Sequence, residues 1–388
     1  MSESNLVQNI AELKKLPSTW VVNDFKLVVS DNSGGNKKLA KTDFLELGEI
    51  AIVDQGKELI AGFCNNLNFA VKTKPPYIVF GDHTRIFKYI DFPFVMGADG
   101  TKVLQPKDKN CNAKYLYYFF LSINVPETGY NRHYKYLKDL QIPLPPLETQ
   151  QKIAAILDAA DTLRQKDKAL VAKYDELTQA LFLDMFGDPV SNPKGWEKVE
   201  LGVVSKKITD GEHQNPTAVE EGKHLVMAKD VLDDRVDFSN PRFVSDEDFK
   251  KYISKCKPEF GDIVLVSRGA TVGRCTIVNT DIPFCLMGSV ILIKKSDAFK
   301  GEFISSLLKN NKFLKQLTNV SSASAQQAIY ISHLKKLKII LPHLTIQNQF
   351  AERIAIIEKK KAIAQASLEK SEELFNSLLQ KAFKGELA

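Results

Sequence analysis

The chain has 388 residues, 44% of them apolar, which is enough for two or three domains with separate cores. Its N-terminus shows no basic stretch followed by an apolar core, and no apolar run is long enough to span a bilayer. We therefore expect neither secretion nor a membrane segment, and a cytoplasmic protein. A net charge of +6 is compatible with a phosphate-rich partner but does not by itself indicate one. The five cysteines contain no Cys-x-x-Cys pair, which favours buried thiols over disulfides or a zinc site.

Residues 17–146 are predicted to form an α+β domain, preceded by an N-terminal segment, residues 1–16. Short β-rich runs alternate with turn signals, at Trp20–Val22, Phe25–Val29, Ile50–Val53, Tyr77–Phe80 and Phe92–Met96. A short amphipathic helix is expected at Tyr115–Ile123. Prolines then keep residues 137–146 extended.

A long helix is predicted over residues 147–187. Between about Glu148 and Met185 there is neither glycine nor proline, and apolar residues follow the alternating spacing of four and three that marks one helix face. This predicted seam consists of Ile156, Ala160, Leu163, Leu170, Tyr174, Leu177 and Leu181. Such a helix is roughly 55 Å long at 1.5 Å per residue, and its narrow stripe makes it marginal when alone.

A second α+β domain is predicted over residues 188–343. Its strands are expected at Leu201–Val204, His224–Met227, Ile263–Ser267, Cys275–Val278 and Val290–Ile293, and a helix is expected at Glu302–Leu317. A polar loop at 321–327 precedes the closing segment, where the first domain has the loop 129–133.

The remaining residues, 344–388, repeat the first helix, so the chain is a tandem duplication. A shift of 197 positions superposes Leu144 on Leu341, Gln150 on Gln347 and Phe186 on Phe383. The second predicted seam consists of Phe350, Ile354, Ile357, Ala364, Leu368, Phe375 and Leu378. A second repeated sequence marks where each half begins: Pro17 to Trp20 is similar to Pro193 to Trp196.

The two helices are expected to pair as an antiparallel coiled coil in which the two seams bury each other. Antiparallel pairing returns the C-terminus to the start of the chain, so residues 1–16 would pack near the last helix and the fold would have a pseudo-two-fold axis. Asp167 and Lys361 interrupt the seams, and polar residues at such positions can fix the register of pairing. The predicted symmetry matches a DNA site with two half-sites.

The segment Ile142-Pro-Leu-Pro-Pro-Leu-Glu-Thr-Gln150 resembles the entry to the helical regions of specificity subunits of Type I restriction-modification systems. The second copy, residues 340–347, differs in placing His343 where the first has Pro146. Within the second domain, Asp210-Gly-Glu-His213 and residues 261–269 are also similar to stretches of this family. The first domain lacks the Asp-Gly-x-His sequence.

This resemblance implies a non-catalytic subunit whose two target-recognition domains each read one half of an asymmetric, interrupted sequence in double-stranded DNA. The helices would set the spacer and dock two methyltransferase subunits, and endonuclease/translocase subunits would join for cleavage. The chain itself would need no cofactor or metal. The resemblance places S-adenosylmethionine in the methyltransferase, and ATP and magnesium in the endonuclease.

Several polar side chains are candidate DNA contacts in the predicted loops. Arg85 is favoured over His83 as a base reader because arginine binds a guanine edge with two hydrogen bonds, and Gln326 and Gln327 suit adenine. Gly211 permits close approach to a backbone, and two roles are open for His213, a DNA contact or a brace of the loop. The complete set of candidates is Lys37, Lys38, Lys74, His83, Arg85, Arg132, His133, Lys135, Lys206, Lys207, Gly211, His213, Arg268, Gln326 and Gln327.

Two other classes of function remain open from the sequence. One is a coiled-coil adaptor whose domains bind proteins, and the other is a free-standing methyltransferase or nuclease. Lys74-Pro-Pro-Tyr77 resembles the adenine-methyltransferase signature, but that signature needs Asn or Asp to accept a hydrogen bond from the target amino group. Lysine cannot accept one, so we interpret this sequence as a structural turn.

Overall fold

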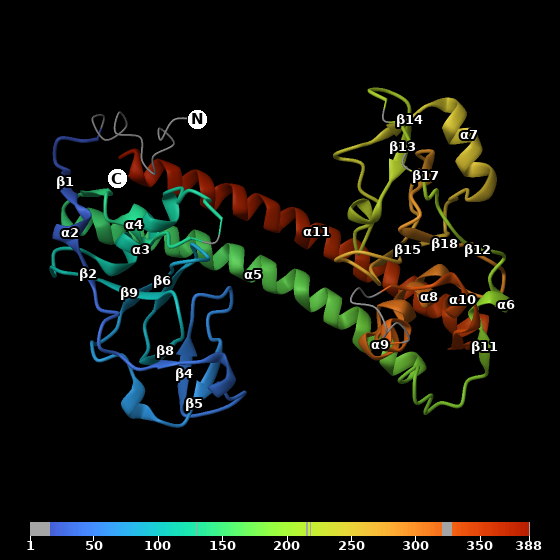
Figure 1. Cartoon of the computed structure of the whole chain (residues 1–388), viewed down its shortest axis with the longest axis horizontal. Coiled ribbons are helices and arrows are strands. Elements are labelled where there is room, and N and C mark those ends of the chain that lie inside the picture. The colour runs from blue at the N-terminus through green and yellow to red at the C-terminus, as the bar shows by residue number, and fades with distance from the viewer. Residues whose placement is uncertain (1–15, 130, 215, 218, 320–327, 388) are drawn as a thin grey trace. The chain divides into compact units, whose positions relative to one another are not determined.

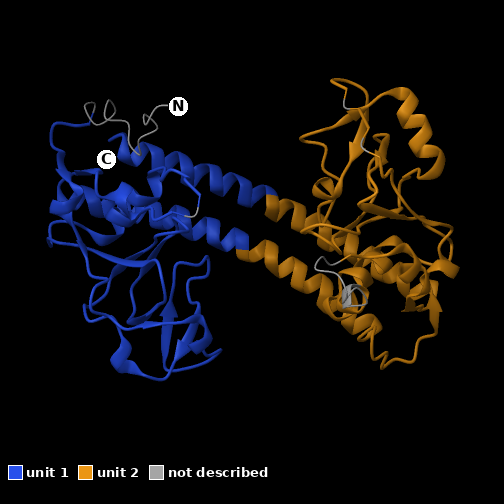
Figure 2. Ribbon diagram, in the orientation of Figure 1, with its two compact units in different colours: residues 1–168, 366–388 blue, residues 169–365 orange. Residues whose placement is uncertain are grey.

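The computed structural model describes residues 16–129, 131–214, 216–217, 219–319 and 328–387. It divides into two compact units. Unit 1 comprises residues 1–168 and 366–388, and unit 2 comprises residues 169–365 (Figure 2). The predicted N-terminal segment, apart from Leu16, lies outside the described residues.

Unit 1 contains two four-stranded sheets and a small strand pair. The first sheet has the order β2 (Val29–Asp31), β9 (Thr101–Pro106), β6 (Tyr77–Gly81) and β7 (Phe87–Ile90), with every neighbouring pair antiparallel. The second has the order β3 (Lys38–Leu39), β8 (Phe94–Gly97), β4 (Ile50–Val53) and β5 (Gly62–Cys64), with β8 parallel to both of its neighbours. The pair consists of β1 (Val21–Asp24) and β10 (Gln141–Leu144).

The helices of unit 1 cover its first sheet. Helix α3 (Ala113–Ser122) buries Leu116, Phe119 and Phe120 in one core with Ile78 and Phe80 of β6. The single turns α2 (Phe25–Val28) and α4 (Tyr134–Leu137), and the 3-10 turns η1 (Lys41–Asp43) and η2 (Leu67–Phe69), complete the domain.

Unit 2 repeats this plan. Its four-stranded sheet has the order β12 (Ile208–Asp210), β18 (Val290–Ile293), β15 (Ile263–Val266) and β16 (Cys275–Ile277), again antiparallel throughout. A second sheet contains β14 (Phe243–Val244), β13 (Lys223–Val226) and β17 (Phe284–Leu286), and the strand pair is β11 (Lys198–Glu200) with β19 (Lys338–Ile340). The helices are α6 (Leu201–Val204), η3 (Ala228–Asp230), α7 (Asp246–Lys255), α8 (Gly301–Lys309), α9 (Asn311–Asn319) and α10 (Ile331–Lys336).

Two 40-residue helices, α5 (Leu147–Phe186) and α11 (Leu344–Phe383), pass through both units (Figure 1). In unit 1 the start of α5 packs against the end of α11, with Leu157 and Phe375 in one core. In unit 2 the end of α5 packs against the start of α11, where the rings of Phe186 and Phe350 lie 5.1 Å apart. The helices therefore run antiparallel in each unit, as predicted.

The seam predicted for α11 is confirmed at six of its seven residues, and Leu378 is partly buried beside the buried Leu379. The seam predicted for α5 is correct only at Ala160, Tyr174 and Leu181. Its large aliphatic residues Ile156, Leu163, Leu170 and Leu177 are between 38% and 48% exposed. The buried positions of the first half of α5 are Ile153, Leu157 and Asp167 together with the predicted Ala160. The sequence carries two adjacent apolar stripes on one helix, and the pairing uses the stripe with small and polar members because α11 supplies bulky side chains such as Phe375.

Three local predictions also differ from the structure. Phe25–Val29 was expected to be a strand, but it begins with the turn α2, which buries Phe25 and Val28 on one side. Leu201–Val204 is likewise a helical turn, α6, and not a strand. The single helix expected at Glu302–Leu317 is two helices, because the side chain of Asn310 caps α9 by accepting hydrogen bonds from the backbone of Lys312 and Phe313.

The glutamine shared by the two repeats fastens each long helix to the domain before it. Gln150 is 1% exposed, donates to the Pro145 carbonyl at 2.8 Å and accepts from the Asn112 amide at 2.8 Å. Gln347 is 0% exposed, donates to the Pro342 carbonyl at 2.7 Å and accepts from the Lys300 amide at 2.9 Å. Asn112 and Lys300 precede α3 and α8, so the repeated segment is structurally explained.

Replacing Gln150 or Gln347 by Ala is expected to lower the free energy of unfolding by about 1–3 kcal/mol, because each change leaves a buried amide and carbonyl without partners. Urea denaturation measures the loss. Gln151→Ala and Gln349→Ala are matched controls at exposed neighbouring positions, and equal losses in control and test variants would contradict the assignment.

Candidate nucleic-acid interface

In unit 1 the strand register brings several loops to one end of the first sheet. Gly81 at the end of β6 pairs with Thr101 at the start of β9, and β2 also ends on this side, at Asp31. The backbone of His133 donates to the Asp82 carbonyl at 2.9 Å, which adds a fourth loop. We call this group, residues 32–37, 82–86, 98–100 and 131–133, the loop edge of unit 1.

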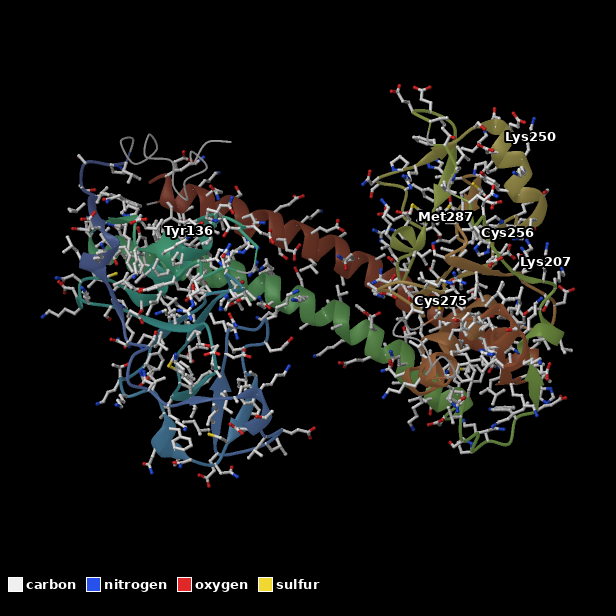
Figure 3. All side chains as sticks on the ribbon, in the orientation of Figure 1. Tyr136, Lys207, Lys250, Cys256, Cys275 and Met287 are labelled. Carbon is white, nitrogen blue, oxygen red and sulfur yellow. The ribbon has the colours of Figure 1, made fainter. Side chains whose placement is uncertain are left out.

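Unit 2 has an equivalent loop edge. Asp210, Ile291 and Leu265 lie in one row across the sheet, so β12 and β15 end, and β18 begins, on the same side. Arg268 forms a bridge with Ala328, which brings in the segment before α10. The loop edge of unit 2 is thus residues 211–214, 267–274, 287–289 and 328. Met287 and Lys207 are labelled at different ends of the sheet in Figure 3.

The candidates of unit 1 are only partly brought together. His83, Arg85, Arg132 and Lys37 lie in the loop edge, and Lys38 and Lys135 follow it directly in β3 and α4. Lys74 lies at the opposite end of the sheet, where with Pro76 and Gln105 it lines a hollow of about 530 Å³. The structure therefore separates Lys74 from the other candidates.

Two of these side chains are held within the domain. His133 is 1% exposed, and its Nδ1 lies 2.9 Å from the Asp82 carbonyl, so in this conformation it fixes two loops to each other and does not face a ligand. Arg85 has a φ of 63° and pairs with Glu127 at 3.2 Å, while it also donates to the Val125 carbonyl at 3.3 Å. The carboxylate of Glu127 offsets the charge that favoured Arg85 as a base reader.

The candidates of unit 2 divide between the two ends of the sheet. Gly211, His213 and Arg268 lie in the loop edge, whereas Lys206 and Lys207 precede β12 at the other end. There the Lys294 amide donates to the Lys207 carbonyl at 2.9 Å. Gln326 and Gln327 lie outside the described residues.

Gly211 and His213 build the loop that bears them. A Cβ added to Gly211 would clash with the Leu286 carbonyl, so glycine is needed for packing against β17 rather than for approach to a ligand. Nε2 of His213 lies 2.8 Å from Asp210, and its side chain remains 50% exposed. His213 therefore braces the turn and still presents part of its ring at the surface.

Helix α7 contributes basic residues that the sequence interpretation missed. Lys255 lies 3.6 Å from Asp210, at the end of β12. Hydrogen bonds from the Gln214 and His213 backbones lower the pKa of the Glu212 carboxyl, and the charges of Lys255 and Lys251 act in the same direction. The amphipathic run 246–255 behind Ser245, an N-terminal cap, was the signal that could have revealed this helix.

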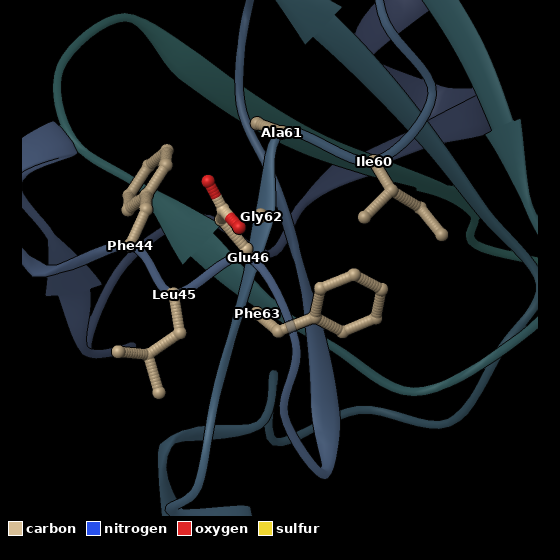
Figure 4. A pocket seen from close by; sticks show the side chains of 7 residues that line it. All are labelled: Phe44, Leu45, Glu46, Ile60, Ala61, Gly62 and Phe63. Carbon is tan, nitrogen blue, oxygen red and sulfur yellow. The ribbon is translucent and has the colours of Figure 1, made fainter. Parts of the chain in front are cut away.

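An open hollow of about 430 Å³ lies on the second sheet of unit 1, lined by Phe44, Leu45, Glu46, Ile60, Ala61, Gly62 and Phe63 (Figure 4). Its lining holds one carboxylate and no cation. Across the described ranges, no three His, Cys, Asp or Glu side chains gather as metal ligands would. No helix in those ranges has the length and apolar character needed to cross a bilayer.

Comparison with known proteins finds the same family domain in both halves of the chain. The family model of the Type I restriction modification DNA specificity domain matches residues 23–172 and again residues 193–373. The chain belongs to this family. The predicted duplication and the predicted family are thereby confirmed, and the two matched ranges carry the two loop edges.

Individual relatives are distant. The chain is similar to the Type I restriction enzyme MjaVIII specificity subunit of Methanocaldococcus jannaschii, with 25% identity over 73% of this chain and 72% of that one. It is also similar to the EcoBI specificity subunit of Escherichia coli, with 25% identity over 65% and 59% of the two chains. A crystal structure of a Type I S subunit from M. genitalium has the same fold, with a TM-score of 0.56, 16% identity and 98% of each chain covered.

Gly211→Ala is expected to destabilise unit 2 by about 1–3 kcal/mol, because the added methyl group must displace the backbone at Leu286. Trp196 fluorescence in a Trp20→Phe background follows urea unfolding of this unit. Gly301→Ala is the control in the same unit, because the nearest atom to its added Cβ lies at 3.4 Å, an ordinary contact distance, and it should lower stability far less than Gly211→Ala. An unchanged Gly211→Ala midpoint would contradict the packing role.

Proposed function

We propose that this specificity-family chain reads a bipartite sequence in double-stranded DNA for a Type I restriction-modification complex, with each loop edge recognising one half. The observation that carries the proposal is the duplication of the loop edge. In both units two strands of the four-stranded sheet end there, a third begins there, and the segment before α4 or α10 joins them. Loops on a rigid sheet are well suited to reach base edges. The unlike side chains of the two edges suit an asymmetric target.

In this proposal the chain recognises and assembles, and partner subunits carry out the chemistry. It works in the cytoplasm without a cofactor of its own. S-adenosylmethionine is bound by two methyltransferase subunits, and ATP and magnesium by endonuclease/translocase subunits. Lys74, at the place where a methyltransferase signature needs a hydrogen-bond acceptor, supports this division of roles.

The long helices offer each unit a surface for the methyltransferases. In unit 1, Ile156 and Leu163 of α5 are exposed beside the seam, together with Leu374 of α11. In unit 2, the exposed residues are Leu170 and Leu177 of α5 with Ile356 and Ile363 of α11. Apolar residues repeating every seven positions on an exposed flank are what a further helix needs in order to join a coiled coil. We therefore assign docking of methyltransferase helices to this stripe.

The target is expected to be a two-part motif with a methylated adenine in each half. Methylome sequencing of a host expressing the complete system would reveal it. Exchange of residues 193–340 for the corresponding domain of another specificity subunit should change one half only, because the loop edge of unit 2 lies within that segment. The reciprocal exchange of residues 17–143 is the control, and a change in both halves after either exchange would refute the division.

Leu163→Glu and Leu170→Glu are each expected to weaken methyltransferase binding at least about tenfold, because they place a charge in the centre of the proposed contact. Titration of the purified chain with methyltransferase measures the affinity. Ala172→Glu adds the same charge at an exposed position away from the stripe and should leave binding unchanged. Equal affinities for all three variants would remove the stripe as the docking surface.

A further inference from the structure

The same pair of backbone hydrogen bonds holds the centre of both loop edges. In unit 1 the Asp82 amide donates to the Gly100 carbonyl at 2.7 Å, and the Asp82 carbonyl accepts from His133 at 2.9 Å. In unit 2 the Ser267 amide donates to the Ser289 carbonyl at 2.9 Å, and the Ser267 carbonyl accepts from Ile329 at 2.8 Å. We call each arrangement the loop clamp.

The loop clamp shows which residues of unit 1 and unit 2 occupy equivalent positions, and these residues are not related by the shift of 197 positions. Asp82 and Ser267 are each the first residue after the matching strand, β6 or β15, and they are only 4% and 3% exposed. The residues that follow them, His83 and Arg268, therefore occupy the same position in the two units. The shift of 197 that relates the helices would instead place His83 opposite Thr280, which follows β16.

This position lies at the centre of the loop edge. The clamp residue is bonded to the loop before β9 or β18 and to the loop before α4 or α10, so the chain is fixed directly before His83 or Arg268. A side chain that discriminates between bases must be held to within a fraction of an ångström, and a fixed backbone supplies that precision. Side chains nearer the rim of the edge lack this support from both sides.

Arg268 has the chemistry and the space for base recognition. It is exposed, and none of the ion pairs among the described residues involves it, in contrast to Arg85 with its partner Glu127. No atom lies within 4 Å of where a Cβ on the neighbouring Gly269 would stand, so the surface beside Arg268 is open. Its planar guanidinium group matches the O6 and N7 acceptors of guanine in the major groove.

We propose that His83 and Arg268 are the equivalent specificity-determining residues of the two units, and that Arg268 selects guanine in the half-site of unit 2. This inference rests on the proposed function. His83 is oriented for the corresponding role in the other half, since its amide donates to Gln55 at 3.1 Å and its Nδ1 lies 3.2 Å from the Asn131 carbonyl.

The test uses Arg268→Gln in the complex with methyltransferase subunits. Methylation rates are measured on duplexes in which each base pair of both half-sites is varied in turn. The expected result is a loss of discrimination at one G·C pair of the unit 2 half, on the order of tenfold to a hundredfold, with the other half unchanged. His83→Ala should relax one position in the unit 1 half only.

Lys206→Gln is the matched control, because it removes one positive charge from an exposed residue at the opposite end of the same sheet. It should leave base preference unchanged. If Arg268→Gln instead weakens binding to all sequences equally and lowers the salt dependence by about one phosphate contact, Arg268 binds the backbone and the inference is overturned. An Arg268→Gln complex with unaltered discrimination overturns it as well. A wild-type complex without any sequence preference would refute the proposed function itself.

Discussion

The buried amides of Gln150 and Gln347 are the constraint on which the architecture of each unit depends. A glutamine amide is both a donor and an acceptor, and in each repeat it uses one function on the proline segment before a long helix and the other on the backbone that precedes α3 or α8. The start of α5 is thus fixed to α3, and the start of α11 to α8. Since α3 packs on the sheet that ends in the loop edge, the first turn of α5 and the loops of unit 1 belong to one rigid body.

Polar residues between α5 and α11 fix the register in which the two helices pair. In unit 1 the Ser367 hydroxyl donates to the buried Asp167 carboxylate at 3.2 Å, and in unit 2 Lys361 pairs with Asp175 at 2.5 Å. Burial alone would lower the pKa of Lys361, but the bond to Asp175 outweighs it and the net shift is upward, so the ammonium form is favoured. A slip of one heptad would take Ser367 away from the buried Asp167 and Asp175 away from the largely buried Lys361, so these pairs favour a single register over competing ones.

The features that could be predicted from the sequence were the long helices and the duplication, because periodicity and repetition reveal them. Helix α5 was placed to within one residue at each end, because glycine and proline are absent between Glu148 and Met185. Helix α11 begins at Leu344 as predicted and ends at Phe383, inside the predicted region 344–388. The register of α5 could not be predicted in the same way. Two stripes on that helix have equal periods, and only the partner's side chains decide which is buried. The single turns α2 and α6 were missed because a four-residue segment with three apolar residues is equally compatible with a strand.

The candidate site was predictable as a set of loops but not as a set of roles. Loop position follows from the ends of strands, and the structure places His83, Arg132, His213 and Arg268 in loops, as predicted. Their roles depend on tertiary hydrogen bonds that no local pattern contains, which is why His133 is internal and Arg85 is paired with Glu127.

The loop clamp shows how one backbone frame can serve two different recognition surfaces. Asp82 and Ser267 differ in side chain, yet both units hold the loop through main-chain groups, and the residues at His133 and Ile329 differ in polarity while both are buried. Since main-chain bonds do not depend on side-chain identity, the side chain of the residue that follows the clamp can change without breaking these two bonds. Arg268 is exposed and forms no ion pair among the described residues, so a change there can alter which base is preferred at little cost in folding. Two recognition domains that vary independently on a duplicated scaffold require this separation of stability from specificity.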